Sequence, residues 1–384
     1  MFERPVGGDR ALIVALTLAR ESRGEGDEAR TGEIAALALS AGASIAGTIG
    51  GRRARPDPAT FAGSGKVEEI AALRKSVGAD LVIFDHVLSG VQQRNLEQAL
   101  ECRVIDRTSL ILDIFAQRAR SAEGKLQVEL AQLNHMATRL AGGWTHLERQ
   151  KGGIGLRGPG ETQLETDRRL IGQRVKLLND RLARVAVSRR TQSRTRRRAA
   201  VRTIALVGYT NAGKSTLFNR LTKANVRAAD QLFATLDTTL RRWHVEGAQQ
   251  LVLSDTVGFI RDLPHDLVAA FSATLAEAAD ADLLLHVIDA AAADRDAQID
   301  AVDAVLREIG AAEVPQIRVL NKCDLAGLPP GVERDGCDTI STVRVSALTG
   351  AGCAELRAAL AERYPRDDRF LTTPTHDQAP ALPG

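Results

Sequence analysis

The residues best suited to chemistry lie in one short segment, GYTNAGKS, which runs from Gly208 to Ser215. It matches the pattern GxxxxGK[ST], follows a short apolar run expected to be a strand, and precedes a helix-like stretch, as a phosphate-binding loop requires. Its glycines let backbone N–H groups wrap around a phosphate, Lys214 brings a positive charge to the β- and γ-phosphates, and the Ser215 hydroxyl suits Mg2+. These residue types at this spacing predict a nucleoside triphosphate site.

Three further segments follow in the order expected of a guanine-nucleotide site, each after a predicted strand. DTVG begins at Asp255, whose carboxylate suits a magnesium-bound water, and ends at Gly258, whose amide can sense a γ-phosphate. NKCD ends at Asp324, whose carboxylate accepts hydrogens from guanine N1 and N2 and selects guanine, because adenine lacks the N2 donor. Asn321 is expected at the other edge of the base, and Ser346 opens a segment that presents a backbone N–H to the base carbonyl. The predicted substrate is GTP.

Between the phosphate loop and DTVG lies LFATLD, which begins at Leu232. A GTPase needs a threonine here to complete the magnesium shell when γ-phosphate is present, and spacing alone leaves Thr235, Thr238 and Thr239 open. Phe259 follows DTVG, where Ras-like enzymes carry a glutamine that orients the attacking water. Whether or not this phenylalanine simply packs against the sheet, we expect slow intrinsic hydrolysis unless a partner supplies or orders the missing group.

The composition limits the class of protein. The 384 residues include 51 Lys+Arg and 48 Asp+Glu, for a net charge of +3, and 44% of residues are hydrophobic. This is ordinary for a globular chain of roughly two to three domains, and it excludes a disordered chain, a collagen and a polycation. The apolar runs are too short to span a bilayer, the N-terminal residues do not resemble a secretory signal, and the four cysteines show neither disulfide nor zinc spacing. We therefore expect a cytoplasmic monomer without a membrane span, with peripheral membrane association left open.

Four segments are expected along the chain. Residues 1–107 alternate short apolar runs with helix-like stretches, which predicts a small α/β domain with a largely parallel sheet. Residues 108–200 carry two apolar stripes at helical spacing, which predict an antiparallel helical hairpin, a coiled-coil arm. Residues 201–366 hold the GTPase motifs, and residues 367–384 have the composition of a disordered tail. The predicted fold class is α/β, with a P-loop GTPase domain preceded by a small α/β domain and the arm.

Three other features are noted for their charge or glycine content. The predicted loop of the arm is basic and rich in glycine between Gly152 and Gly160, which favours a groove of RNA or protein as its partner, with a partnerless loop as the alternative. Seven arginines and no acid lie between Ser188 and Arg202, which indicates either a phosphate contact or a solvated linker. GSGK at residues 63–66 lacks phosphate-loop spacing and is interpreted as a turn before a helix near residue 67.

The chain also resembles the HflX family of ribosome-associated GTPases, of the translation-factor-related class. The resemblance is carried by DRTSLILDIFAQRARSAEGKLQVELAQL from Asp106, GGIGLRGPGETQLETDRR from Gly152 and LFATLDTTLRR from Leu232. It implies that Thr235 is the switch-I magnesium ligand and that Phe259 is the family's hydrophobic replacement for glutamine. It further implies binding to the large ribosomal subunit, which stimulates GTP hydrolysis, an arm tip directed at rRNA near the peptidyl-transferase region, and dissociation of stalled or idle ribosomes.

Two positions depart from the family pattern. Thr238 stands where the family usually has proline, which could loosen switch I, and Leu156 stands in the tip where threonine is frequent. Neither change removes a nucleotide ligand. The alternative function is a GTP-dependent switch whose main partner is another protein or a non-ribosomal RNA, whereas NKCD disfavours a metabolic kinase.

The expected site residues fall into three groups. The catalytic residues are Lys214, Thr235 and Gly258. The magnesium ligands are Ser215 and Thr235. The nucleotide contacts are Gly208, Tyr209, Thr210, Asn211, Ala212, Gly213, Lys214, Ser215, Phe233, Ala234, Thr235, Leu236, Asp237, Asp255, Thr256, Val257, Gly258, Asn321, Lys322, Cys323, Asp324, Ser346, Ala347 and Leu348.

Overall fold

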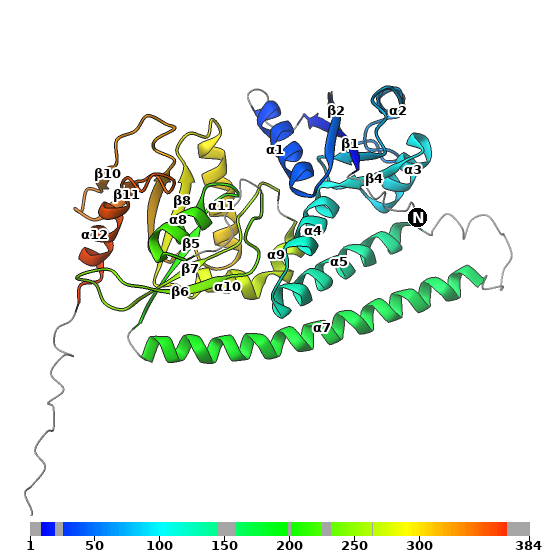
Figure 1. Cartoon of the computed structure of the whole chain (residues 1–384). Helices are drawn as coiled ribbons and strands as arrows, with labels where there is room; N and C mark the ends of the chain where they lie inside the picture. Colours follow the sequence, from blue (N-terminus) through cyan, green and yellow to red (C-terminus); the bar gives the residue numbers. More distant parts are fainter. Residues whose placement is uncertain are drawn as a thin grey trace, which may run out of the picture.

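The computed structural model describes residues 9–19, 26–143, 159–198, 201–224, 232–262 and 264–366. These residues form an N-terminal α/β domain, a larger C-terminal α/β domain and an arm of two long helices (Figure 1). The arm tip up to residue 158 and the tail at residues 367–384 lie outside the described residues, so the expectations for them stay predictions. Among the described helices, none combines the length and apolar character needed to cross a membrane.

The N-terminal domain is built on a four-stranded parallel sheet with the order β2-β1-β3-β4. Its elements are β1 (Arg10–Leu18), α1 (Gly26–Ser40), β2 (Ser44–Arg53), α2 (Ser64–Val77), β3 (Leu81–Phe84), α3 (Gly90–Leu100), β4 (Arg103–Asp106) and α4 (Arg107–Arg118). Because successive side chains of a strand point to opposite faces, Leu12 and Val14 of β1 enter a core with α2 and α3, while Ala11 and Ile13 enter a core with α1 and α4. The predicted parallel α/β domain is confirmed.

The GSGK segment enters α2: Gly63 is the N-cap, and the helix begins at Ser64, three residues before the predicted start. Lys66 forms an ion pair with Glu69 at 2.6 Å, one turn further along the same helix. The interpretation of this segment as a helix entry rather than a phosphate loop is confirmed.

The C-terminal domain contains a seven-stranded sheet with the order β10-β11-β9-β8-β5-β7-β6, in which the edge strands β6 and β10 are antiparallel to their neighbours. Its strands are β5 (Arg202–Val207), β6 (Thr239–Trp243), β7 (Leu251–Asp255), β8 (Leu283–Asp289), β9 (Gln316–Asn321), β10 (Gly331–Arg334) and β11 (Ile340–Arg344). Its helices are α8 (Lys214–Thr222), α9 (His265–Ala270), α10 (Ser272–Ala279), α11 (Arg295–Glu308) and α12 (Cys353–Arg363). The carboxyl ends of β5, β7, β8, β9 and β11 share one edge, and the strand order reverses at β5, where open α/β sheets bind ligands.

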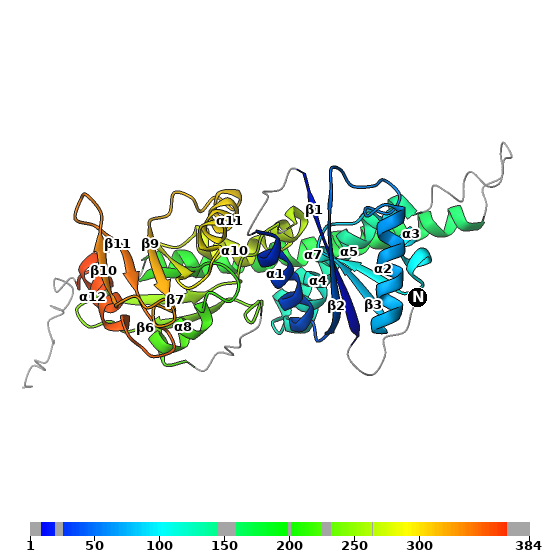
Figure 2. The same ribbon diagram turned by 90° about the horizontal axis from the view of Figure 1, so that it is seen from above.

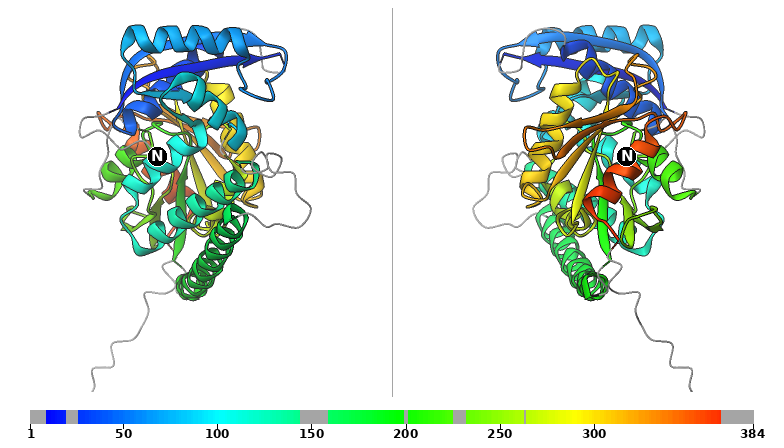
Figure 3. Two further views of the ribbon diagram at one scale, coloured as in Figure 1. Left: turned by 90° about the vertical axis from the view of Figure 1, so that its right-hand side faces the viewer. Right: turned by 90° about the vertical axis from the view of Figure 1, so that its left-hand side faces the viewer.

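The arm consists of α5 (Ala122–Gly143) and the 40-residue α7 (Pro159–Arg198). The helices are antiparallel, since Glu129 pairs with Arg174 at 2.6 Å and Glu123 pairs with Arg189 at 2.8 Å. Figures 1 and 3 show α7 running below both domains. The predicted hairpin is confirmed.

The arm helix α7 is longer than the sequence predicted. It begins at Pro159, within the expected connection, and continues through the arginine run to Arg198. Arginine is a good helix former, and the first arginine of the run, Arg189, is neutralised by Glu123 and by Glu277 at 3.7 Å. The run is therefore helical as far as Arg198, which is exposed, and the choice between a phosphate contact and a solvated linker stays a prediction.

The two α/β domains share one apolar core. Phe115 of α4 contacts the rings of Phe233 and Phe271 edge to face, with centroids 4.7 and 4.9 Å apart. The Ser40 hydroxyl at the end of α1 accepts a hydrogen bond from the Leu232 amide at 3.1 Å. Figure 2 shows α1 and α4 at the junction between the two sheets. The predicted switch I thus packs directly on the N-terminal domain.

Candidate active site

The phosphate-loop motif connects β5 to α8 and contacts the NKCD loop. Gly213 has φ 91°, and a Cβ added there would overlap Nδ2 of Asn321. That amide nitrogen donates to the Ala212 carbonyl at 2.8 Å. Because α8 begins at Lys214 and its N-cap Gly213 offers no side-chain cap, the first backbone N–H groups of α8 are available to an anion.

The Lys214 ammonium lies inside this loop, with the residue only 6% exposed. Its Nζ donates to the carbonyls of Gly208 and Tyr209 at 2.9 and 2.7 Å. Burial lowers the pKa of Lys214 from 10.5 to about 8, and the charge of Asp255 opposes that shift. An anionic ligand beside Nζ would restore the full positive charge, so the position favours phosphate oxygens.

Three side-chain oxygens meet beside the loop. Oγ of Ser215 lies 2.6 Å from Oγ1 of Thr235 and donates to Oδ2 of Asp255 at 2.7 Å, and Oγ1 of Thr235 donates to the same carboxylate oxygen at 3.1 Å. Burial raises the pKa of Asp255, opposed by the Ser215 hydrogen bond and by Lys214. The other oxygen, Oδ1 of Asp255, is buried without a hydrogen-bond partner among the described residues. A hard cation such as Mg2+ prefers such oxygen donors, so this cluster fits it.

The structure places Thr235, Thr238 and Thr239 differently, although their spacing alone could not show which of them would reach the magnesium ion. Thr235 lies at the oxygen cluster, whereas Thr238 accepts a hydrogen bond from Arg189 of the arm at 3.4 Å and Thr239 opens β6, paired with Asp255 of β7. Thr235 is therefore the threonine placed to reach a cation.

The DTVG segment is joined to the phosphate loop by backbone hydrogen bonds. The Thr210 amide donates to the Phe259 carbonyl at 2.7 Å, and the Phe259 amide donates to the Gly208 carbonyl at 3.1 Å. A Cβ on Gly258 would lie 3.0 Å from Nζ of Lys214, so glycine leaves this approach open. Phe259 is 1% exposed and packs within the shared core, as one of the two interpretations of this residue expected. From this position its apolar ring cannot orient a water molecule.

The NKCD loop lies beside the phosphate loop, but Asn321 uses its side chain internally. Its Oδ1 accepts from the Ala347 amide at 2.9 Å while its Nδ2 donates to Ala212, so it ties the phosphate loop to the segment that begins at Ser346. These two bonds leave the second hydrogen of Nδ2 for the base edge, so the expected contact of Asn321 with the base stays a prediction. Asp324 and Leu348 are exposed next to it.

Several non-glycine residues of these loops have left-handed backbone conformations. They are Asn211 in the phosphate loop (φ 61°), Phe233 before Thr235 (φ 54°) and Lys322 in NKCD (φ 60°). Such conformations cost energy and concentrate at ligand-binding sites. Their occurrence in three separate loops at one sheet edge indicates a functional site.

Ten predicted residues line one pocket together. They are Thr210, Asn211, Gly213, Lys214, Ser215, Phe233, Ala234, Thr235, Thr256 and Gly258. Thr216 also lines this pocket and was missed, although its place after Ser215 in the first turn of α8 is a usable signal. Other predicted contacts do not line it: Lys322 forms an ion pair with Asp289 at 2.7 Å, and Cys323 is buried. Leu236 and Val257 are buried in the shared core, and the Asp237 carboxylate accepts from backbone amides at the start of α5.

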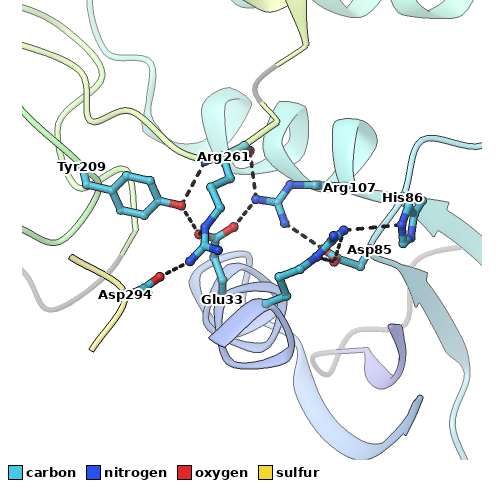
Figure 4. A network of polar contacts seen from close by, with 8 residues as sticks. Glu33, Asp85, His86, Arg107, Tyr209, Arg261 and Asp294 are labelled. Carbon is cyan, nitrogen blue, oxygen red and sulfur yellow. Dashed lines mark hydrogen bonds and ion pairs between the residues drawn. The ribbon is translucent and has the colours of Figure 1, made fainter. Parts of the chain in front are cut away.

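A polar network links the N-terminal domain to this site (Figure 4). The Tyr209 hydroxyl donates to Glu33 of α1 and accepts from the Arg261 amide at 3.0 Å. Arg107 donates to Glu33, to Asp85 at 2.7 Å and to the Arg261 carbonyl at 3.1 Å. Burial and the charge of Glu33 raise the pKa of Tyr209, and Glu33 with Asp85 raise the pKa of Arg107 against the effect of burial. No local sequence pattern predicts a role for Glu33, because its partner Tyr209 lies 176 positions away along the chain.

A phosphate loop on the central strand, backed by a cation-binding oxygen cluster and an adjoining NKxD loop, defines the class of P-loop GTPases. Three family models match the chain: GTP-binding GTPase N-terminal over residues 28–116, GTP-binding GTPase Middle Region over 118–197, and 50S ribosome-binding GTPase over 203–322.

Curated relatives narrow this class to one family. The chain is 57% identical to GTPase HflX of Escherichia coli (strain K12) over 364 residues, which cover 94% of this chain and 84% of that protein. It is 48% identical to GTPase HflX of Caldanaerobacter subterraneus subsp. tengcongensis over 328 residues, 85% of this chain and 76% of that protein. The chain belongs to the HflX family and is a GTP hydrolase.

A solved structure shares the fold over most of the length. The crystal structure of SsGBP in complex with GDP aligns with a TM-score of 0.50 and 22% identity, covering 92% of this chain and 98% of that one. The fold is therefore also present in a solved GTP-binding protein.

Proposed function

We propose that this GTPase acts on the ribosome as a cytoplasmic monomer. In its GTP state it binds the large ribosomal subunit, contact with the subunit stimulates hydrolysis, and binding dissociates stalled or idle ribosomes. The burial of Phe259 carries the proposal, because this apolar, buried side chain cannot orient water and we expect an outside partner to supply or order the missing group. The match of residues 203–322 to a model described as a 50S ribosome-binding GTPase supports the large subunit as that partner.

The site residues have separate roles in this proposal. Ser215 and Thr235 would hold Mg2+, with Asp255 behind a bound water, and the ion neutralises charge on the phosphate oxygens when bound. Lys214 places its ammonium against the β- and γ-phosphates, and the Gly258 amide donates to the γ-phosphate. Hydrolysis removes that acceptor, so the segments at Thr235 and Gly258 are then released.

The remaining contacts would select the base. Asp324 accepts from guanine N1 and N2 through its exposed carboxylate. Backbone groups at Ser346, Ala347 and Leu348 face the base carbonyl, and Asn321 holds their loop against the phosphate loop.

The arm would carry the contact with rRNA through its tip between Gly152 and Gly160, of which residues 152–158 lie outside the described residues. The length of α7 and its attachment to α5 by the Glu129–Arg174 and Glu123–Arg189 pairs support a stiff arm that can reach a distant groove.

The test is GTP hydrolysis by the purified full chain with and without purified large ribosomal subunits, at matched salt concentration because phosphate contacts are salt-dependent. Lys214→Ala is the control for contaminating ribosomal GTPases, and small subunits control for RNA in general. We expect large stimulation by the large subunit alone. If GTP still binds but neither subunit stimulates hydrolysis, the main partner is another protein or a non-ribosomal RNA.

A second experiment addresses the tip. Deletion of residues 152–160 should abolish GTP-dependent cosedimentation with large subunits and leave GTP affinity unchanged. Normal cosedimentation of the deletion variant would show that the tip does not carry the contact.

A further inference from the structure

The two residues that precede the arm helix α5 are held by a side chain of the GTPase domain. Oδ2 of Asp237 accepts hydrogen bonds from the amides of Arg120 and Ser121 at 2.9 and 2.8 Å. The Ser121 hydroxyl donates to the other carboxylate oxygen of Asp237 and accepts from the Gly124 amide at 2.8 Å. Amides at a helix start have no partners within the helix and favour a negative charge. A carboxylate 116 positions further along the chain therefore completes the start of α5.

Gly124 makes this close approach possible. A Cβ added to Gly124 would overlap Oδ1 of Asp237 and lie 3.1 Å from Oγ of Ser121. Alanine is the better helix former at an ordinary interior position, so glycine here weakens α5 in isolation. What glycine provides is room for the Asp237 carboxylate.

Asp237 lies two residues after Thr235, and the segment 232–237 that contains both is fixed at its two ends by other parts of the chain. At its start, the Leu232 amide donates to Ser40 of α1 and Phe233 packs on Phe115. At its end, Asp237 is held by α5. Residues outside the GTPase domain therefore hold the segment in which Thr235 reaches Ser215 and Asp255.

We propose that Ser121 and Gly124 are positioning residues for GTP hydrolysis: through Asp237 they hold Thr235 at the cation site. The coupling works in both directions, so a closed switch I also completes the start of the arm helix. The inference rests on the proposed assignment of Thr235 as a magnesium ligand, and it does not require the ribosome to be the partner.

The role predicts a separation between hydrolysis and GDP binding, because GDP lacks the γ-phosphate that orders switch I. In the full chain without ribosomes, Gly124→Ala should lower kcat in single-turnover hydrolysis with Mg2+ by about tenfold, as expected for the loss of one hydrogen bond to a charged group. The affinity for GDP should change less than about twofold. Ser121→Ala should also lower kcat, and Ser121→Thr, which keeps the hydroxyl, should restore it.

Gly172→Ala is the matched control, because Gly172 lies in α7 of the same arm and a Cβ there would meet nothing within 4 Å. It should leave both kcat and GDP affinity unchanged. An unchanged kcat for Gly124→Ala would overturn the proposal. An equal loss of hydrolysis and GDP affinity would overturn it too, because it would indicate general damage to the fold.

Hydrogen exchange measures the coupling in the opposite direction. With Mg2+ and a non-hydrolysable GTP analogue, the amides of Arg120 and Ser121 should exchange more slowly than with GDP, and Gly124→Ala should abolish the difference. Equal exchange in the two nucleotide states of the unaltered chain would refute the coupling. Because no ribosome is present, either result is independent of whether ribosome binding is correct.

Discussion

Replacing Arg107 tests the network that joins the two α/β domains. Arg107→Met removes a guanidinium that is 4% exposed and leaves the carboxylates of Glu33 and Asp85 buried with less compensating charge. Removing one partner of a buried ion pair typically costs about 3–5 kcal/mol. Arg30 stays 3.3 Å from Asp85 and offsets part of this, so we expect a loss of about 3 kcal/mol in the free energy of unfolding.

The double variant Glu33→Gln with Arg107→Met makes the prediction specific. It removes one charge of each sign, so it leaves no carboxylate at position 33 without its cation and should cost less than the two single changes added together, by about 1–3 kcal/mol. The assay is urea unfolding at fixed GDP concentration, compared at the first transition because a chain of several domains need not unfold in one step. Additive losses, or a fully stable Arg107→Met variant, would refute the description of the network.

Three other changes are predicted. Asp324→Asn should weaken the preference for GTP over ATP and XTP in competition titrations, since an amide accepts through one oxygen only; unchanged selectivity would remove Asp324 from base recognition. Ser215→Ala should abolish Mg2+-dependent GTP hydrolysis, measured as phosphate release, and normal release would show that this hydroxyl is dispensable. Burial and the charges of Arg318 and Lys214 lower the pKa of His286 from 6.5 to about 4, so the unfolded chain binds a proton that the folded chain excludes. Stability should therefore fall by about 3 kcal/mol as pH drops from 6.5 to 4, and His286→Gln should flatten that part of the urea-unfolding pH profile.

Local patterns predicted most of the sheet positions and the phosphate loop. The short apolar run before the phosphate loop forms the strand β5, as expected, and the alternating pattern before residue 107 forms a parallel sheet. Both predictions are correct because the alternation of a strand and the spacing of a phosphate loop each depend on a few consecutive residues.

The contacts that position the site could not be predicted in this way. Asp237 reads as part of a nucleotide motif, but its carboxylate binds amides 116 and 117 positions away. The motif predicts a base contact for Asn321, but it does not predict that the same side chain also joins two loops of its own domain. Such choices depend on which backbone groups the fold leaves without partners, and that is a property of tertiary structure.

The shared core around Phe115 also affects how the chain is made. Synthesis runs from the N-terminus, so α1 and α4 emerge while Phe233 and Phe271, which cover them, are not yet made. Roughly 150 further residues must be added after α4, which at about 5–20 residues per second takes on the order of 10 to 30 seconds. During that interval the apolar face of the nascent N-terminal domain is not yet covered. We therefore expect chaperones to bind this face until the GTPase domain has been synthesised.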